Sequence, residues 1–264
     1  MEEISINIER GQRLSDVMSD IPSNIILHKT VCGIGATTLE LNSARNSIII
    51  EPNVPVIKGK EQKHPYMLGV YERVSAKDIE DYIKGEEYPK KIMTTPESFP
   101  KIKRAMRDTG ADMYGTYFLL YDECDRLVSD ADYRNTVTLP TNDFFRFGQK
   151  AMVSATPIMP SDPRFTENGF KVCRIVPTYD YRQDVEIIQT NNVMTMLRMT
   201  LEVLDREDRV CVFFNSTNGI ENIINRAGIR ENSHVFCSTE SMEKLMSKGF
   251  RNVSDTLTVM NGYA

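Results

Sequence analysis

Glycine and hydroxyl residues gather in the segment Thr30-Val31-Cys32-Gly33-Ile34-Gly35-Ala36-Thr37-Thr38, directly after a short apolar run. Glycines let consecutive backbone N–H groups curl around an anion, and a helix that starts behind them adds the positive end of its dipole. A hydroxyl at Thr37 stands where it could ligate Mg²⁺. The pattern therefore predicts a phosphate-binding loop at Gly33, Ile34, Gly35, Ala36, Thr37 and Thr38. A glycine-containing turn that binds no ligand is the alternative.

A second segment carries two adjacent carboxylates. Asp122 and Glu123, followed by Cys124 and Asp125, come directly after the apolar run YFLLY. An Asp at the end of a strand can hold Mg²⁺, and the neighbouring Glu can orient or deprotonate an attacking water. The alternative is a solvated acidic helix start, because Asp and Glu favour first turns.

A third segment, Ser154-Ala155-Thr156, again ends an apolar run, and by itself it is typical of a simple turn. The order of the three segments adds weight to each of them. In open parallel sheets, ligands bind at the carboxyl ends of the strands. We therefore expect the loop at residues 33–38 to connect a central strand to a helix, with Asp122 facing it.

Short apolar runs alternate with helix-like stretches, which predicts an α/β fold with a parallel sheet covered by helices on both faces. The expected strands are residues 24–27, 47–50, 92–94, 117–121, 151–154 and 172–176, and the expected helices are residues 76–84 and 100–109. The pattern restarts after Pro177, with a helix at 193–204, a strand at 209–214, a helix at 219–227 and a strand at 234–237. We predict domains at 1–180 and 181–264, the second being small for an independent α/β domain.

Taken together, the loop, the Asp-Glu pair and the Ser-Ala-Thr segment resemble the superfamily 2 helicases and translocases. This family carries a GxGKT loop, a DExD/H box and an SAT motif in its first lobe. The resemblance covers residues from about 24 to 220. It implies a RecA-like first lobe followed by a partial, truncated second RecA-like lobe, with ATP and Mg²⁺ as cofactors. It assigns catalysis to Glu123 and Asp122, metal binding to Thr37 and Asp122, and coupling to Ser154 and Thr156.

Two further segments of the first domain are similar to motifs that touch a nucleic-acid backbone in this family. One contains Pro52 and Asn53, and the other is Thr94-Thr95-Pro96-Glu97. In the second domain, Val212-Phe213-Phe214-Asn215-Ser216 resembles the motif that opens the family's second lobe, so Ser216 joins the expected contacts. For the two segments of the first domain, a turn marked by proline is the alternative. The resemblance implies single-stranded DNA or RNA as the partner.

The chain departs from the family at Ala36, which stands where a lysine neutralises the transferring phosphate. Loss of one preorganised electrostatic group typically lowers the rate by about 10²–10³. Lys29 is close in sequence, but it precedes the loop, so we expect it at the end of the strand. The late motifs of the family, including its arginine finger, are expected to be missing. We therefore expect a hydrolysis-impaired or fragmentary motor.

The bulk composition sets limits on partners and location. A formal net charge of −5 excludes an overall basic field, so nucleic-acid binding would need a local groove and backbone hydrogen bonds. The five cysteines form no CxxC pair, and no apolar run approaches the length of a membrane span. These features predict a cytoplasmic protein with reduced thiols and no membrane partner.

Two functional hypotheses remain. The first is an ATP-dependent nucleic-acid helicase or translocase, which the retained acidic pair and the Ser154 and Thr156 hydroxyls favour. The second is a non-catalytic scaffold or nucleic-acid-binding module with the same fold, which Ala36 favours.

Overall fold

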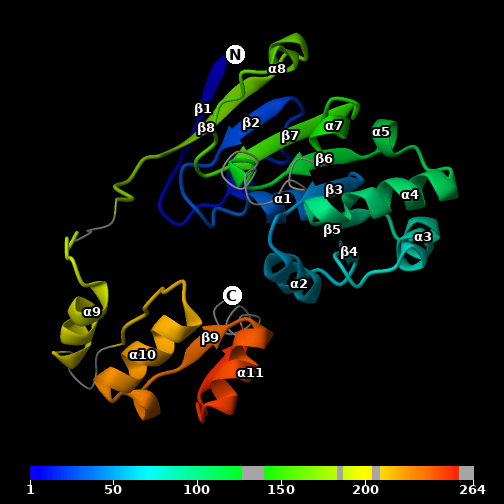
Figure 1. Cartoon of the computed structure of the whole chain (residues 1–264). Helices are drawn as coiled ribbons and strands as arrows, with labels where there is room; N and C mark the ends of the chain where they lie inside the picture. The colour runs from blue at the N-terminus through cyan, green and yellow to red at the C-terminus, as the bar shows by residue number, and fades with distance from the viewer. Residues whose placement is uncertain (127–139, 183–186, 204–208, 256–264) are drawn as a thin grey trace. The chain divides into compact units, whose positions relative to one another are not determined.

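The computed structural model describes residues 1–126, 140–182, 187–203 and 209–255 of the chain (Figure 1). The chain divides into two compact units, Met1–Arg182 and Gln183–Ala264. The sequence pattern places the division at residue 180, two residues earlier. Each unit has its own core and is described by itself.

The first unit is built on an eight-stranded sheet with the order β1-β8-β2-β7-β6-β3-β5-β4. Every neighbouring pair of strands runs parallel, so all carboxyl ends meet at one edge (Figure 1). The strands are β1 (Glu3–Ile8), β2 (Ile25–His28), β3 (Ser47–Ile50), β4 (Met67–Val70), β5 (Lys91–Thr94), β6 (Phe118–Tyr121), β7 (Gln149–Ser154) and β8 (Lys171–Pro177).

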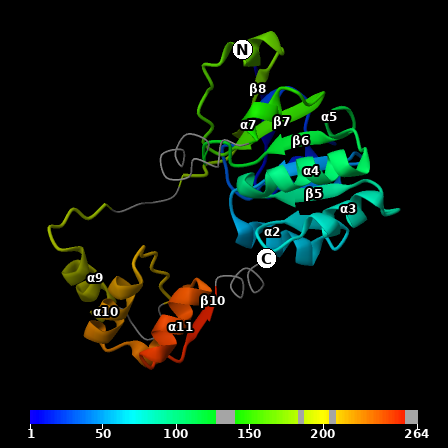
Figure 2. The same ribbon diagram turned by 45° about the vertical axis from the view of Figure 1, so that its right-hand side comes forward.

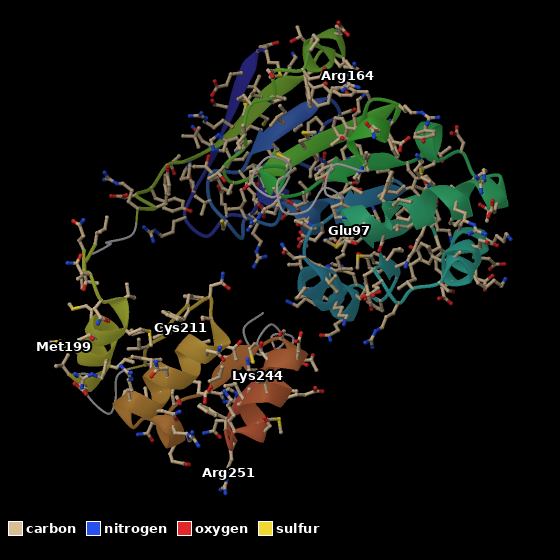
Figure 3. All side chains as sticks on the ribbon, in the orientation of Figure 1. Glu97, Arg164, Met199, Cys211, Lys244 and Arg251 are labelled. Atoms are coloured by element: carbon tan, nitrogen blue, oxygen red, sulfur yellow. The ribbon has the colours of Figure 1, made fainter. Side chains whose placement is uncertain are left out.

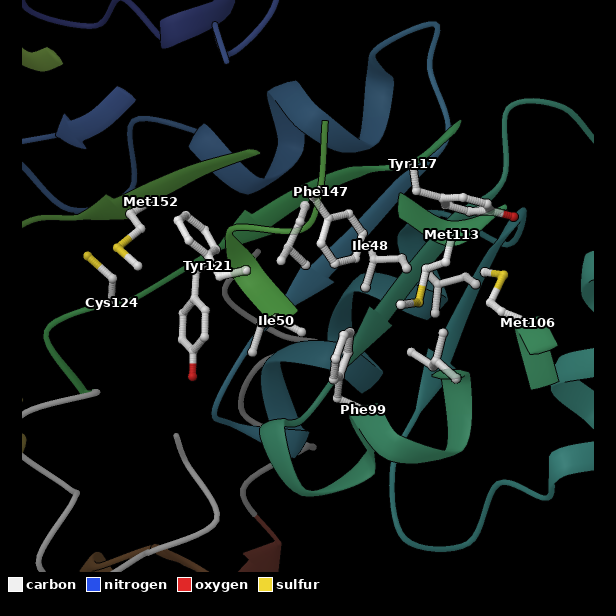
Figure 4. Close-up of a cluster of buried hydrophobic side chains, with 14 of the residues drawn as sticks. Ile48, Ile50, Phe99, Met106, Met113, Tyr117, Tyr121, Cys124, Phe147 and Met152 are labelled. Atoms are coloured by element: carbon white, nitrogen blue, oxygen red, sulfur yellow. The ribbon is translucent and has the colours of Figure 1, made fainter. Parts of the chain in front are cut away.

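Helices cover both faces of this sheet, because successive strand residues point to opposite faces and most of the strands are apolar on both. Ile48 and Ile50 join one buried cluster, shown in Figure 4, whereas Ile49 joins the other. The helices are α1 (Ala36–Asn42), α2 (Val54–Lys63), α3 (Ala76–Lys84), α4 (Phe99–Thr109), α5 (Met113–Thr116), α7 (Thr141–Phe144) and α8 (Pro163–Glu167). The predicted α/β class with a helix-covered parallel sheet is confirmed (Figure 2).

Two strands and one long helix of this unit have no counterpart in the sequence prediction. The edge strand β1 is mostly exposed, so it lacks the apolar run that marks the central strands. Strand β4, at the other edge, contains Gly69, a residue that is depleted in strands. Helix α2 is only weakly amphipathic, because Ile57 is its one fully buried residue. Its sequence therefore lacks the repeated apolar positions that would predict a helix.

The second unit packs three helices against a parallel pair of strands. Its elements are α9 (Val193–Glu202), α10 (Thr217–Ala227), β9 (Val235–Cys237), α11 (Thr239–Ser247) and β10 (Val253–Asp255). The small core joins Ile223 and Ile224 of α10 to Val235, Leu245 and Phe250. Among the residues that the structure describes, no helix has the length and apolar character needed to cross a membrane.

The predicted strand at 209–214 is wrong. These residues form an irregular stretch between α9 and α10, in which Figure 3 labels Cys211. Phe213 is 92% exposed, and Val210 and Val212 are also exposed. A residue has a high strand propensity because its side chain packs well on the half-buried surface of a sheet. Among the described strands, neither β9 nor β10 pairs with this stretch, and its side chains are mostly exposed instead of packed on a sheet.

A buried polar network ties α1 to the sheet in the first unit. The fully buried Glu40 carboxylate accepts hydrogen bonds from Arg45 Nε and Nη2, at 3.0 and 2.6 Å. The fully buried Lys91 ammonium donates to Glu40 O, Ser43 Oγ and Ser47 Oγ at 2.7, 2.8 and 3.0 Å. The network closes because Ser47 Oγ also donates to the Glu40 carboxylate. Since α1 directly follows the predicted phosphate loop, this network fixes the position of that loop.

We predict that Glu40→Ala lowers the free energy of unfolding of the first unit by about 3–5 kcal/mol, because it leaves Lys91 and Arg45 without their buried counter-charge. Urea unfolding followed by circular dichroism measures the change. The control is Lys77→Ala, which breaks an exposed ion pair with Asp81 and should leave the midpoint unchanged. Equal midpoints for the two variants would contradict a structural role for the network.

Candidate nucleotide-binding site

The glycine-rich loop leaves β2 and enters α1, as the sequence predicts. Lys29 N still donates to Ser154 O at 2.9 Å, so the pairing of β2 with β7 extends one residue beyond the strand. Gly33 and Gly35 have φ angles of 77° and 92°, a left-handed region in which glycine carries no steric penalty. Gly35 is the N-cap residue of α1, so the helix begins at Ala36.

The acidic segment lies directly against this loop. Asp122 is 2% exposed, and its Oδ2 accepts a hydrogen bond from Thr37 Oγ1 at 2.5 Å. Its other oxygen, Oδ1, accepts from Glu123 N at 3.0 Å. Glu123 has φ 49°, an unusual conformation for a residue with a β-carbon. The geometry predicted from the order of the segments, with Asp122 facing the loop, is therefore present.

Lys29 provides the positive charge next to this acidic pair. Its ammonium lies 2.6 Å from Glu123 Oε1 and 3.7 Å from Asp122 Oδ1. Burial by itself lowers the pKa of Lys29, but the negative charge of Asp122 and the hydrogen bond to Glu123 outweigh it, and the pKa is raised. The lysine therefore stays charged at neutral pH.

The Ser-Ala-Thr segment is linked to the acidic segment through Asp125. Ser154 Oγ donates to Asp125 Oδ1 at 2.7 Å, and Thr156 Oγ1 lies 3.5 Å from Asp125 Oδ2. Thr156 N donates back to Ser154 Oγ at 3.0 Å. These hydroxyls thus contact the last residue of the Asp122–Asp125 segment, and the ends of β6 and β7 are joined through their side chains.

The loop encloses a small hollow of about 170 Å³. This volume is below the roughly 300–1,000 Å³ of a typical small-molecule site, so it fits phosphate groups better than a whole nucleotide. Three cations line it together with residues 33–38, namely Arg13, Lys29 and Lys60. Sequence reasoning missed Arg13 and Lys60, because neither belongs to a recognisable pattern. Lys60 comes from α2, and its ammonium donates to Thr38 Oγ1 at 2.8 Å.

The two segments predicted to touch nucleic acid lie side by side at the ends of β3 and β5, where Glu51 N donates to Thr94 O at 2.9 Å. Their side chains differ in exposure. Asn53 is exposed and Glu97, labelled in Figure 3, is half-buried, whereas Pro52, Thr94, Thr95 and Pro96 are buried. Thr94 Oγ1 donates to Val70 O at 2.9 Å within the sheet. The Thr94 hydroxyl is thus engaged within the sheet, and the predicted contacts of Thr94 and its neighbours with nucleic acid stay predictions.

Ser216 belongs to the second unit, where it is the N-cap residue of α10 and accepts a hydrogen bond from Gly219 N at 3.1 Å. The Ser216 hydroxyl therefore has a structural role, because it caps the first turn of α10. Its predicted contact with nucleic acid stays a prediction.

Glu51, which the sequence prediction did not include, is a buried carboxyl group beside this site. It is 3% exposed, and its Oε1 accepts hydrogen bonds from Asn53 N and Nδ2 at 2.9 and 3.0 Å. Burial, reinforced by the negative charge of Asp122, raises its pKa to about 8. Glu51 therefore carries a proton at neutral pH, which prevents a third negative charge next to Asp122 and Glu123.

The donor set at this site suits a magnesium–phosphate group. Mg²⁺ usually takes only one or two protein oxygen ligands together with phosphate oxygens and water. Thr37 Oγ1 and Asp122 Oδ2 already lie at contact distance, next to the cation-lined hollow. Among the described residues, no three His, Cys, Asp or Glu side chains group to form an all-protein metal site. Thr37 and Asp122 offer one hydroxyl and one carboxylate, which suit a magnesium ion whose other ligands would be phosphate oxygens and water.

Fold and site thus define a parallel α/β protein in which the strand ends bring a glycine turn and an acidic pair together, next to a hollow lined by Arg13, Lys29 and Lys60. Neither a protein-family model nor a curated protein matches the chain. Among solved structures, the chain is similar to a DEAD box protein from the hyperthermophile Methanococcus jannaschii, with 13% identity, a TM-score of 0.43, and coverage of 88% of this chain and 69% of that one. It is also similar to the Pyrococcus furiosus Hef helicase domain, with 11% identity and a TM-score of 0.38. That match covers 86% of this chain but about half, 51%, of the Hef chain.

We predict that Glu51 makes the stability of the metal-free protein depend on pH between 4.5 and about 8. The folded state retains a proton on Glu51 that the unfolded chain releases. The contribution of Glu51 is therefore full below pH 4.5 and is lost as pH rises through about 8. Unfolding midpoints measured across this range should fall for the wild type relative to Glu51→Gln, which cannot titrate. Parallel curves for the two proteins would show that Glu51 ionises normally.

Proposed function

We propose that this chain binds ATP with Mg²⁺ and acts as a nucleic-acid helicase or translocase of the superfamily 2 type, with weakened hydrolysis. The observation that carries the proposal is the contact of Thr37 with Asp122 at the mouth of a cation-lined hollow. A hydroxyl and a carboxylate in contact beside a glycine loop are the two protein ligands that a nucleotide-bound magnesium ion requires.

Each group of residues at the site has its own role in the proposed function. The loop at residues 33–38 supplies backbone N–H groups to the phosphates, while Thr37 and Asp122 hold the metal. Magnesium, when bound, neutralises charge on the phosphate oxygens. Glu123 orients the attacking water, and Ser154 and Thr156 couple the site to the neighbouring strand through Asp125. We expect Asn53 and Glu97, whose side chains are exposed and half-buried, to lie next to a nucleic-acid backbone.

Ala36 supports a second candidate function, that of a module that binds nucleotide or nucleic acid without turnover. The family resemblance puts a lysine at this position, and Ala36 carries no charge. Phosphate release from ATP, measured with and without single strands, separates the two functions. Turnover above background that single strands stimulate supports the motor, and we expect it below the roughly 10 per second of a typical enzyme. Nucleotide binding with no phosphate release would support the binding module.

We predict that Thr37→Ala weakens magnesium-dependent ATP binding by about tenfold or more, because it removes one of the two protein ligands of the metal. The matched variant Thr37→Ser keeps the hydroxyl and should bind like the wild type. Calorimetric titration with ATP, with and without Mg²⁺, measures both. Equal magnesium dependence in the alanine and serine variants would remove Thr37 from the metal site.

We also predict that single-stranded nucleic acid binds next to Asn53 through its phosphates. Fluorescence anisotropy of labelled DNA and RNA strands should show weak binding that falls as salt rises, because phosphate contacts release counterions. Asn53→Asp places a negative charge there and should weaken binding several-fold. The matched control is Asn42→Asp on the exposed end of α1, which should bind like the wild type. Similar losses in both variants would mean that net charge alone acts, and unchanged binding in both would place the strand elsewhere.

A further inference from the structure

The phosphate loop has a charge deficit that residues outside the loop can correct. Ala36 lies at the first position of α1 and is 4% exposed, so the loop itself carries no cation. Arg13, Lys29 and Lys60 nevertheless line the hollow, in a chain whose net charge is −5. A phosphate chain held only by backbone N–H groups would lack the fixed charge that stabilises phosphoryl transfer.

Lys29 is the cation built most firmly into the site. Its ammonium contacts Glu123 Oε1 at 2.6 Å and lies 3.7 Å from Asp122 Oδ1. The other oxygen of Asp122 accepts from Thr37, so one carboxylate lies between the ammonium and the hydroxyl assigned to the metal. Directly after Lys29, the chain turns through Thr30 at φ 57°, and the Thr30 hydroxyl donates to Ile175 O at 2.6 Å. The backbone that carries this lysine is therefore anchored on both sides.

Lys60 is a weaker candidate than Lys29 for the missing phosphate-binding charge. Its ammonium donates to Thr38 at 2.8 Å, one residue beyond the hydroxyl assigned to the metal. Burial and the neighbouring charge of Lys63 lower its pKa, so its positive charge is held less firmly than that of Lys29. Arg13 lines the hollow, but it is exposed to solvent. Among the ion pairs of the described residues, Lys29 is the one of these three cations that pairs with both Asp122 and Glu123.

We propose that Lys29 supplies the phosphate-binding charge that the loop lacks at residue 36, with its ammonium passing from Glu123 to the terminal phosphate of the bound nucleotide. The inference rests on the proposed function. It also gives Glu123 a second role, since its carboxylate holds the ammonium until the phosphate arrives. When Lys29 moves to the phosphate, Glu123 is free to orient the attacking water. Nucleotide binding therefore switches Glu123 from holding the lysine to orienting water.

The competing explanation is that Lys29 only neutralises two adjacent carboxylates, the buried Asp122 and the half-buried Glu123. A terminal-phosphate contact predicts an effect that neutralisation does not, namely loss of the preference for ATP over ADP. In Lys29→Met this preference should collapse, and turnover should fall by about 10²–10³. The double variant Lys29→Met with Ala36→Lys moves the charge onto the loop, because residue 36 also lines the hollow, and it should restore the preference.

A matched control tests whether loss of any buried lysine on this sheet has the same effect. Lys150, near the amino end of β7, is 3% exposed and donates to Phe147 O at 3.1 Å. It lies at the opposite end of the strand from Ser154. Lys150→Met should therefore keep the wild-type preference for ATP over ADP, whatever it does to stability.

Calorimetric titrations of the wild type and the variants with ATP and ADP in the presence of Mg²⁺ separate the possible failures. If the wild type binds neither nucleotide, the proposed function fails. If the wild type prefers ATP and Lys29→Met prefers it equally, the proposed function survives and Lys29 is not the phosphate ligand. Circular dichroism shows whether each variant is folded.

If Lys29→Met does not fold, a structure of the wild type with Mg²⁺ and a non-hydrolysable ATP analogue decides the matter. We expect Lys29 Nζ within about 3.2 Å of a terminal phosphate oxygen. An ammonium still paired with Glu123, with Lys60 on the phosphate instead, would overturn the proposal.

Discussion

The parallel pairing of β2 with β7, and of β7 with β6, is the constraint on which the site depends. Because these strands run in the same direction, their carboxyl ends form one edge, and three segments that are far apart along the chain reach the same place: Thr37 and Asp122 are 85 residues apart, and Asp125 and Ser154 are 29 apart. Two backbone hydrogen bonds extend that pairing past the strands, from Lys29 N to Ser154 O and from Cys124 N to Val153 O. The side-chain contacts of Thr37, Asp122 and Ser154 follow from this register.

Charge balance is the second organising principle of the site. Asp122, Glu123, Asp125 and Glu51 lie on neighbouring strand ends, so four ionised carboxylates would repel one another strongly. The protein lowers that repulsion in three ways. Lys29 pairs with two of the carboxylates, two hydroxyls reach Asp125, and burial keeps Glu51 protonated. The same arrangement leaves the cation-lined hollow next to the acids available for anionic groups.

Sequence reasoning predicted the central strands and the juxtaposition of Thr37 with Asp122, because buried parallel strands are apolar on both faces and their order fixes which ends meet. It could not predict the edge strand β1, whose residues are mostly exposed and alternate between polar and apolar, so that no apolar run marks it. The apolar stretch at 209–214 misled it, since propensity does not show whether a partner strand exists. Lys60 was missed because tertiary packing of α2, rather than spacing along the chain, brings it to the site. Glu51 lies at a strand end, but a single glutamate there gives no sign in the sequence that it is buried.

Thr30, which follows Lys29, and Glu123, which pairs with it, both have left-handed backbones despite carrying a β-carbon. Such a conformation costs on the order of 1–3 kcal/mol and persists only where the surroundings enforce it. Glycine would relieve that strain at either position, yet it would delete the Thr30 anchor or the Glu123 carboxylate. The protein therefore keeps a strained backbone at these two residues, and the side chains that the strain holds in place are the Thr30 hydroxyl, which anchors the chain beside Lys29, and the Glu123 carboxylate, which pairs with it.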